Sequence, residues 1–198
     1  MVKFKFLPLE KIVVTSPYGL RNLTVNGINY WWHNGIDLYA NLQTPVYAVD
    51  DGTVMAAKYD GEGYGYYIAL NHGKFGTLYA HLLNNVVTQG KTVKAGDLIG
   101  YSGDTGTTTG PHLHLELRIC TYDNFWDRAS CDRSVFMRTV DPMLFIEEYQ
   151  ESAKALTLET AISIVKTKAG LEDKTMDYIA NDYKYGNDLI TKLAKALL

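Results

Sequence analysis

The chain has 198 residues, of which 46% are apolar and 21% charged, a composition typical of a globular protein with one sizeable core. The formal net charge is −3 and no basic block occurs, so nothing favours binding to nucleic acid or to an anionic membrane surface. No stretch approaches the roughly 18 consecutive apolar residues of a membrane span. The N-terminal segment has neither the apolar core nor the cleavage site of a signal peptide, and we therefore expect a protein made in the cytoplasm.

Short β-branched segments separated by glycine-containing turns occupy the first half of the chain. The expected strands are residues 12–14, 45–49, 53–57, 66–70, 77–80 and 97–101. Asp50, Asp51 and Gly52 predict a tight hairpin between the strands that flank them, and residues 71–76 predict a longer turn. Because no helical periodicity lies between these segments, the sequence predicts a mainly β domain with an antiparallel sheet.

A further strand is expected within residues 110–118, where polar and apolar side chains alternate. His112, His114, Glu116 and Arg118 would share one face, while leucines on the other face cover the core. Two histidines on the open face of a rigid strand are suited to holding a metal and moving a proton. His-x-His is a short pattern, however, and a half-buried strand that shows two histidines to solvent is the alternative.

The character of the chain changes near Asp141. Asp141 and Pro142 are typical of a helix N-cap and first turn, and they predict a helix that starts there. Beyond residue 150, apolar residues recur at helical spacing in three stripes, with Thr157 as a cap and Gly170 and Gly186 as stops. The stripes are Leu158, Ala161, Ile162 and Val165, then Met176, Ile179, Ala180 and Tyr183, then Leu189, Ile190, Leu193, Ala194 and Leu197. We expect a β domain at residues 1–150 and a small helical module at 151–198, which would be only marginally stable alone.

Four of the five histidines occur in turns or at strand ends that can bring them together. His33 and Asp37 flank an Asn-Gly dipeptide, which breaks a helix and turns both side chains toward one point. His81 ends an expected strand, and His112 and His114 share the strand described above. A catalytic zinc site takes three ligands from His, Asp or Glu and keeps one position open. Two of these histidines and the carboxylate would therefore bind zinc, and two histidines would remain for proton transfer.

The remaining candidates for special chemistry are one histidine and two cysteines. His72 is interpreted as a turn residue with local hydrogen bonds. Cys120 and Cys131 either close a disulfide or stay as free thiols, and neither has the Cys-x-x-Cys partner of a zinc site. Residues 121–139 are interpreted as an insertion without an assigned function.

The ordered motifs resemble the M23 family (lysostaphin-type, LytM-like) of zinc metallopeptidases, over roughly two thirds of the chain. The resemblance rests on residues 16–21 (SPYGLR), 33–38 (HNGIDL), 45–48 (PVYA), 51–54 (DGTV), 78–82 (LYAHL), 93–100 (VKAGDLIG), 102–106 (SGDTG) and 110–116 (GPHLHLE), and it extends to residue 142. It implies an antiparallel β-sheet peptidase core with a groove that cleaves the peptide stems or cross-links of bacterial peptidoglycan. Residues 59–66 and 102–110, which are rich in glycine, would form walls of this groove.

Carried over position by position, the resemblance implies that His33, Asp37 and His114 bind one Zn²⁺ per chain. His81 and His112 would be the catalytic pair, one taking a proton from water and the other stabilising the oxyanion or protonating the leaving amine. The sequence does not decide which does which.

The family also often places a tyrosine on the oxyanion side, upstream of the first ligand. Tyr30 is the nearest candidate for that role and Tyr18 the second; the alternative is a packed aromatic ring.

The resulting functional expectation is a zinc endopeptidase that hydrolyses peptidoglycan peptides. The C-terminal helices are similar to small modules of phage and prophage endolysins, which implies release to the wall during holin-assisted lysis. The module at 151–198 would bind the wall, mediate self-association or serve as a packing appendage. Two alternatives stay open: a non-catalytic LytM-like module that binds or regulates peptidoglycan, and a zinc peptidase that acts on a cytoplasmic peptide.

Overall fold

The computed structural model describes residues 3–25, 27–119, 139–154, 158–172, 175, 179, 189–190 and 192–194. The chain divides into two compact units, Met1–Glu147 and Glu148–Leu198. Among the described residues, neither helix is long and apolar enough to cross a bilayer.

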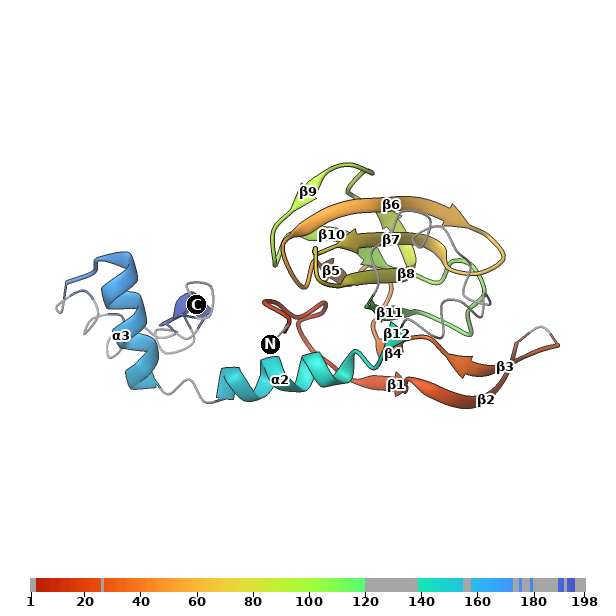
Figure 1. Cartoon of the computed structure of the whole chain (residues 1–198), viewed down its shortest axis with the longest axis horizontal. Coiled ribbons are helices and arrows are strands. Elements are labelled where there is room, and N and C mark those ends of the chain that lie inside the picture. Colours follow the sequence, from red (N-terminus) through yellow and green to blue (C-terminus); the bar gives the residue numbers. More distant parts are fainter. Residues whose placement is uncertain are drawn as a thin grey trace. The chain divides into compact units, whose positions relative to one another are not determined.

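A ten-stranded antiparallel sheet forms the first unit and confirms the predicted mainly β fold (Figure 1). Its central order is β1-β4-β11-β8-β7-β6-β9, with β10 joining β8 to β5 and with β12 beside β11. The strands are β1 (Val14–Ser16), β4 (Ile36–Tyr39), β5 (Pro45–Tyr47), β6 (Gly52–Asp60), β7 (Gly65–Asn71), β8 (Gly76–Asn85), β9 (Thr92–Val93), β10 (Leu98–Ser102), β11 (His112–Arg118) and β12 (Thr139–Val140).

Most of the expected strands are present, but one predicted hairpin is wrong. The turn at residues 71–76 does join the paired strands β7 and β8. The Asp50-Asp51-Gly52 turn, in contrast, joins strands with different partners, because β5 pairs with β10 and β6 pairs with β7 and β9. Its carboxylates contact other segments: Asp50 lies 2.7 Å from the Lys5 ammonium, and Asp51 accepts the backbone N–H of Ala95 at 3.1 Å.

A two-stranded sheet was not expected from the sequence. It consists of β2 (Gly19–Val25) and β3 (Ile28–His33), which pair in antiparallel fashion (Figure 1). The Asn26-Gly27 dipeptide between the two strands is a strong hairpin signal that the prediction had not used. This hairpin ends at His33, so it places one of the candidate ligands.

The alternation of β11 is confirmed, but its polar face is not open along its length. Leu113, Leu115 and Leu117 are fully buried in the main core. On the other face, Glu116 and Arg118 also have exposed fractions of 0%, which corrects the expectation of a solvent-facing row. The two charged groups are buried because they pair with each other, as described below.

The strand β8 changes partner at His81. It pairs with β11 from Gly76 to Ala80 and with β10 from Leu82 to Asn85. His81 lies between these segments and has a φ of 57°, a left-handed conformation that is uncommon for a residue other than glycine. Such irregularities re-aim side chains and cluster next to active sites.

The helices begin where the sequence predicts them. α2 (Met143–Lys154) is capped by Asp141, whose carboxylate accepts the backbone N–H of Met143 at 2.9 Å. In the second unit, α3 (Leu158–Ala169) ends at Gly170, which has a φ of 65°.

The second unit has a small apolar core of its own. Fully buried residues from the first and third predicted stripes form it, namely Ala161, Val165, Ile190 and Ala194. Most of the second stripe, together with Thr157, Gly186, Cys120 and Cys131, lies outside the described residues.

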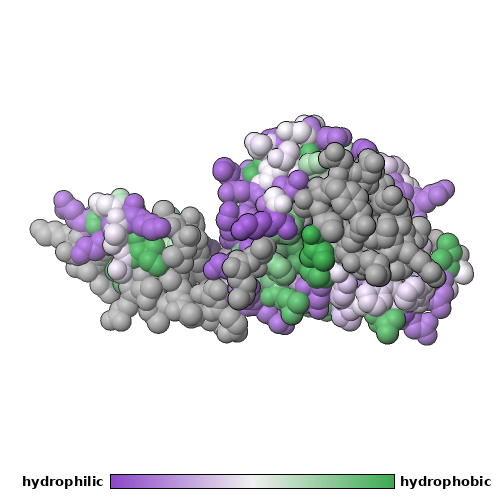
Figure 2. Space-filling view, viewed as in Figure 1, coloured by the Kyte–Doolittle hydropathy of each residue, from purple (hydrophilic) through white to green (hydrophobic). Residues whose placement is uncertain are grey.

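Among the coloured residues of the face drawn in Figure 2, most are hydrophilic or intermediate, and the hydrophobic ones form a few small clusters. Among the described residues, Leu20 of β2 is the most exposed large hydrophobic side chain, and Ile28 and Trp31 of β3 are also more than half exposed. Scattered exposure of this kind is common on soluble domains and by itself indicates no partner.

Candidate metal centre and active site

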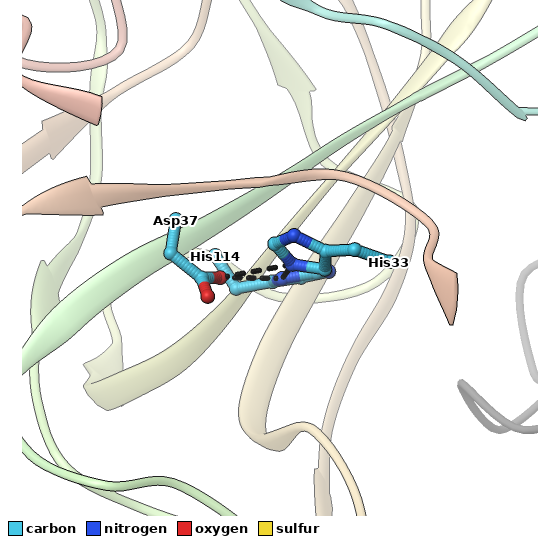
Figure 3. A group of neighbouring side chains, drawn as sticks. All are labelled: His33, Asp37 and His114. Carbon is cyan, nitrogen blue, oxygen red and sulfur yellow. Dashed lines mark hydrogen bonds and ion pairs between the residues drawn. The ribbon is translucent and has the colours of Figure 1, made fainter. Parts of the chain in front are cut away.

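Three side chains from three strands meet at one point (Figure 3). Asp37 of β4 and His114 of β11 are directly opposite each other in the sheet register, and His33 is the last residue of β3. Asp37 Oδ1 lies 3.0 Å from His114 Nδ1 and 3.1 Å from His33 Nε2, and these two nitrogens are 3.0 Å apart. The turn before β4 packs closely on β11 through Gly35, since a Cβ there would lie 2.2 Å from the carbonyl oxygen of Leu115.

Hydrogen bonds on the far side of each ring define which nitrogen can bind a metal. His33 Nδ1 lies 2.9 Å from the carbonyl oxygen of Pro17, an acceptor, so Nδ1 carries the hydrogen and Nε2 is left with a lone pair. His114 Nε2 lies 3.2 Å from Glu116 Oε1, so its Nδ1 is the free nitrogen. Both free nitrogens point to Asp37 Oδ1. Two imidazoles and one carboxylate with these orientations are a donor set that fits a catalytic zinc ion.

The electrostatics of the three side chains also favour a cation. Burial opposes ionisation of Asp37, but the contacts of its carboxylate with the side chains of His112, His114 and His33 outweigh it and hold its pKa far below the usual value. Burial lowers the pKa of His33. For His114, burial likewise disfavours the charged form, yet hydrogen bonds to Asp37 and Glu116 dominate and raise its pKa to about 9. In the metal-free protein a proton on His114 therefore balances the two carboxylates, and a bound metal would take its place.

His81 and His112 form a second group beside the three side chains. Their ring centroids are 4.8 Å apart, and His112 Nε2 lies 3.5 Å from Asp37 Oδ1. Each ring donates its Nδ1–H to a backbone carbonyl, that of Thr105 at 2.8 Å for His81 and that of Gly110 at 2.7 Å for His112. Burial and the neighbouring histidines lower the pKa of His81 to about 3, so it is neutral at physiological pH. Both rings can therefore offer Nε2 as a proton acceptor.

The five residues line one pocket with two different walls. One wall is the β2–β3 hairpin, which contributes Arg21, Leu23, Val25, Tyr30 and Trp32; the other consists of Gly63, Tyr64 and Thr107 to Thr109. The second wall comes from the two glycine-rich stretches that the sequence analysis had singled out. The first wall had been missed together with its hairpin.

The second wall is held together by a close contact between two glycines. A Cβ on Gly65 would lie 2.3 Å from backbone atoms of Thr105, and a Cβ on Gly106 would lie 2.3 Å from the backbone nitrogen of Gly65. Both glycines have positive φ values, of 63° and 78°. The hairpin between β6 and β7 and the loop before β11 are therefore packed backbone to backbone.

The two candidate tyrosines lie in different surroundings. Tyr30 is half-buried and lines the pocket. Tyr18 packs edge-on against Trp32 and donates its hydroxyl to the carbonyl oxygen of Thr139 at 2.9 Å, which explains Tyr18 as a structural residue. Arg21, which the sequence analysis had not considered, places Nη1 3.5 Å from Asp37 Oδ2, the oxygen that faces away from the histidines.

The sequence analysis also missed a buried polar cluster behind His114. Glu116 accepts hydrogen bonds from Tyr64 at 2.5 Å and from Arg118 Nε at 2.7 Å, and it faces His114 on its remaining side. The alternation along β11 had placed Glu116 and Arg118 beside the histidines, which was the available signal. The contribution of Tyr64 is a long-range contact that no local pattern reveals.

His72 lies outside the site, as expected for a turn residue. It follows β7, but its hydrogen bonds are not only local: Nδ1 donates to the carbonyl oxygen of Asp51 at 2.8 Å and Nε2 lies 2.8 Å from Thr77 Oγ1. Burial lowers the pKa of this half-buried ring, which favours its neutral form.

Comparison with known proteins assigns this constellation to a family. Residues 32–126, which contain all five site residues, match the model of peptidase family M23. Glycyl-glycine endopeptidase ALE-1 of Staphylococcus capitis is 40% identical over 109 residues, which are 54% of this chain and 29% of that protein. Peptidoglycan DD-endopeptidase ShyA of Vibrio cholerae is 43% identical over 88 residues, 44% of this chain and 20% of that protein. The chain thus spans less than a third of the length of these relatives.

Solved structures match a larger share of both chains. The catalytic domain of the antimicrobial peptidase lysostaphin from Staphylococcus simulans aligns with a TM-score of 0.56 and 33% identity, over 69% of this chain and 92% of that one. The catalytic domain of the prophage-encoded M23 protein EnpA from Enterococcus faecalis aligns with a TM-score of 0.55 and 28% identity, over 71% of this chain and 95% of that one. On this fold, this donor set and these matches, the chain belongs to peptidase family M23.

Proposed function

We propose that the protein is a zinc-dependent endopeptidase that hydrolyses peptide bonds in the stem or cross-bridge of bacterial peptidoglycan. The observation that carries this proposal is the convergence of His33, Asp37 and His114, with His81 and His112 beside them, in one pocket. The names of the relatives, among them a glycyl-glycine endopeptidase and a peptidoglycan DD-endopeptidase, support the substrate class.

His33 Nε2, Asp37 Oδ1 and His114 Nδ1 would hold the metal. When bound, zinc supplies a Lewis acid that polarises the scissile carbonyl and activates water near neutral pH. His81 and His112 each donate Nδ1–H to a backbone carbonyl, so their Nε2 atoms stay directed at the reacting groups. One accepts the proton of the attacking water, and the other stabilises the developing oxyanion or protonates the leaving amine.

The two walls of the pocket determine how a peptide lies. The hairpin wall is apolar and aromatic apart from Arg21, whereas Thr107 to Thr109 supply hydroxyls and backbone groups on the other side. An extended peptide between them can bind side chains on the apolar wall and hydrogen-bond its backbone on the other. Which peptide bond is cleaved depends on these walls and is the readout of the experiment below.

The biological setting proposed is lysis of a bacterial host by a bacteriolytic endolysin. The support is the likeness to a prophage-encoded M23 catalytic domain and the helical region that follows the peptidase unit. In this setting the protein is made in the cytoplasm and reaches the wall after release, and residues 151–198 bind the wall or mediate self-association.

The test combines metal analysis with wall hydrolysis. Purified protein should contain about one zinc per chain, reduce the turbidity of purified cell walls and lose this activity in chelator, with recovery on zinc addition. Mass spectrometry of the products from walls with glycyl and with direct cross-links identifies the bond. Undiminished lysis by His33→Ala, or co-sedimentation with walls without release of new amino termini, would contradict the enzymatic proposal and favour a binding module. Cleavage of soluble peptides but not of walls would contradict the substrate class.

A further inference from the structure

The cluster behind His114 consists of charged and polar side chains with almost no contact with water. Glu116 and Arg118 have exposed fractions of 0%, Tyr64 of 3% and His114 of 6%. Arg118 approaches Glu116 Oε2 with Nη2 at 2.6 Å and with Nε at 2.7 Å, and Nη2 also donates to the Tyr64 hydroxyl oxygen at 3.2 Å. The carboxylate therefore has partners on both of its oxygens.

Stability alone does not explain why a charged pair is buried here. Removing two ions from water costs several kcal/mol each, and buried ion pairs often contribute no more to stability than well-packed apolar residues of similar volume. The feature that an apolar pair would lack is the contact between Glu116 Oε1 and His114 Nε2, at 3.2 Å. That contact is the polar link between Glu116 and the proposed ligands, beside the packing of the Tyr64 ring against the His114 ring at a centroid distance of 5.9 Å.

The contact has a defined consequence for the imidazole. A carboxylate oxygen can only accept, so the hydrogen of a neutral His114 ring is held on Nε2. The Nδ1–H tautomer would place the lone pair of His114 Nε2 against the buried carboxylate of Glu116, which is unfavourable, and would put the hydrogen on Nδ1. Nδ1 is the atom that lies 3.0 Å from both Asp37 Oδ1 and His33 Nε2. Only the first tautomer leaves it free for a metal.

We propose that Glu116 is a positioning residue that holds His114 in the Nε2–H tautomer and thereby presents Nδ1 to the metal. Arg118 binds Oε2 of Glu116 through Nη2 and Nε and fixes the side chain, and the Tyr64 hydroxyl donates to Oε1, the oxygen that faces His114. The inference rests on the proposed zinc function, but it concerns residues that lie behind the ligands and do not touch the substrate. It separates β11 into a pair of histidines that act at the groove and a pair of charges that support one of them.

The test measures metal binding rather than activity, in the full-length chain. Glu116→Gln keeps the shape of the side chain but replaces one acceptor oxygen with a donor. Zinc affinity, measured by competition with a chromophoric chelator, should fall about 10- to 100-fold. The visible spectrum of the cobalt-substituted protein should change, and long-range ¹H–¹⁵N correlation on zinc-loaded wild-type protein should show His114 as the Nε2–H tautomer.

Two further variants separate positioning from general stability. Tyr64→Phe keeps the carboxylate and its Arg118 partner, so its loss of zinc affinity should be smaller than that of Glu116→Gln. Thr77→Val is the matched control, because Thr77 is a fully buried polar residue of β8 that contacts His72 and Tyr79 and not the ligands. It should lower the melting temperature and leave zinc affinity and the cobalt spectrum unchanged.

A Glu116→Gln protein that binds zinc within about threefold of wild type, with an unchanged cobalt spectrum, would overturn the proposal. If Glu116→Gln fails to fold, the double variant Glu116→Gln with Arg118→Met removes both charges together, so that no unpaired charge is left buried. Weak zinc binding by that variant supports the proposal, and wild-type affinity overturns it. A wild-type protein that binds no zinc would contradict the proposed function, which keeps the two failures distinct.

Discussion

The three proposed metal ligands and the two remaining histidines occupy the same pocket but are anchored in different ways. His33 and His114 are almost fully buried, and the supports of His114 and Asp37 are charged side chains, Glu116 and Arg21. His81 and His112 are held by backbone carbonyls of the loop before β11. Asp37 and His114 therefore depend on charged side chains, and His33 depends on the β2–β3 hairpin and the carbonyl oxygen of Pro17. The catalytic pair depends instead on the loop that forms one wall of the groove. Changes in the two groups should have separable effects.

The largest separation is expected between two alanine variants on one strand. His114→Ala removes a ligand and should abolish zinc binding together with turnover. His112→Ala should keep about one zinc per chain and lose turnover about 10²- to 10⁴-fold, the usual contribution of a general acid or base. Zinc content by atomic absorption and the rate of wall hydrolysis check both. If both variants retained the same amount of zinc, the assignment of His114 as a ligand and of His112 as a proton-transfer residue would be wrong.

A pH titration of metal binding gives the next effect. In the metal-free protein the pKa of His114 is raised to about 9 and that of His81 is lowered to about 3. Below about pH 9 zinc must displace one proton from His114, so the affinity for zinc should weaken about tenfold for each unit by which the pH falls. His81, which is already neutral in this range, should not contribute to the pH dependence of zinc binding. Calorimetry at pH 7.5 in buffers of different ionisation enthalpy should show release of about one proton. If zinc binding released no proton, His114 would not be the protonated group that the metal displaces.

The same shift determines how the stability of the metal-free protein depends on pH. Because the pKa of His114 is higher in the folded protein than its ordinary value of 6.5, its contribution is fully present below about pH 6.5. That contribution is lost as the pH rises toward 9. Thermal melts of chelated protein across this range test the sign, with His114→Gln as the control that should flatten the dependence.

Tyr30 should have a smaller effect, confined to the groove. Tyr30→Phe removes only the hydroxyl from a half-buried residue of the hairpin wall. We expect turnover to fall about tenfold with zinc content unchanged, because one hydrogen-bond donor to a developing oxyanion is lost. Steady-state kinetics on a defined peptide separate this from a role in packing, which would change KM alone. Tyr18→Phe is the matched control, since that hydroxyl binds Thr139.

The smallest expected effect concerns stability at His81. Its φ of 57° is unfavourable for histidine and well tolerated by asparagine. His81→Asn should therefore raise the melting temperature by about 1–4 °C while abolishing turnover. His112→Asn, at a position without positive φ, should abolish turnover without this gain. A decrease in melting temperature for His81→Asn would show that the packing of the imidazole ring stabilises the fold by more than the left-handed backbone of His81 destabilises it.

The sequence predicted correctly those features that depend only on the spacing of nearby residues. The alternation in β11 and the turn between His33 and Asp37 are local patterns, and both lie where they were expected. The β2–β3 hairpin was missed because its Asn-Gly signal was not weighed, and the hairpin at Asp50 was wrong because sheet pairing depends on distant strands. Burial of Glu116 could not be foreseen, since its cover comes from Tyr64, a contact across 52 residues. The roles of the site residues, the limits of the domains and the function of the helical module stay predictions.

The backbone contact between Gly65 and Gly106 has a consequence for redesigning this enzyme. Two segments that are far apart in the sequence meet there without room for a single added carbon. We expect that the two segments can be replaced only together, because the loop before β11 and the β6–β7 hairpin pack backbone to backbone at these glycines. Swapping both together, with the β2–β3 hairpin left in place, is the route by which the cleavage preference could be transferred from one family member to another.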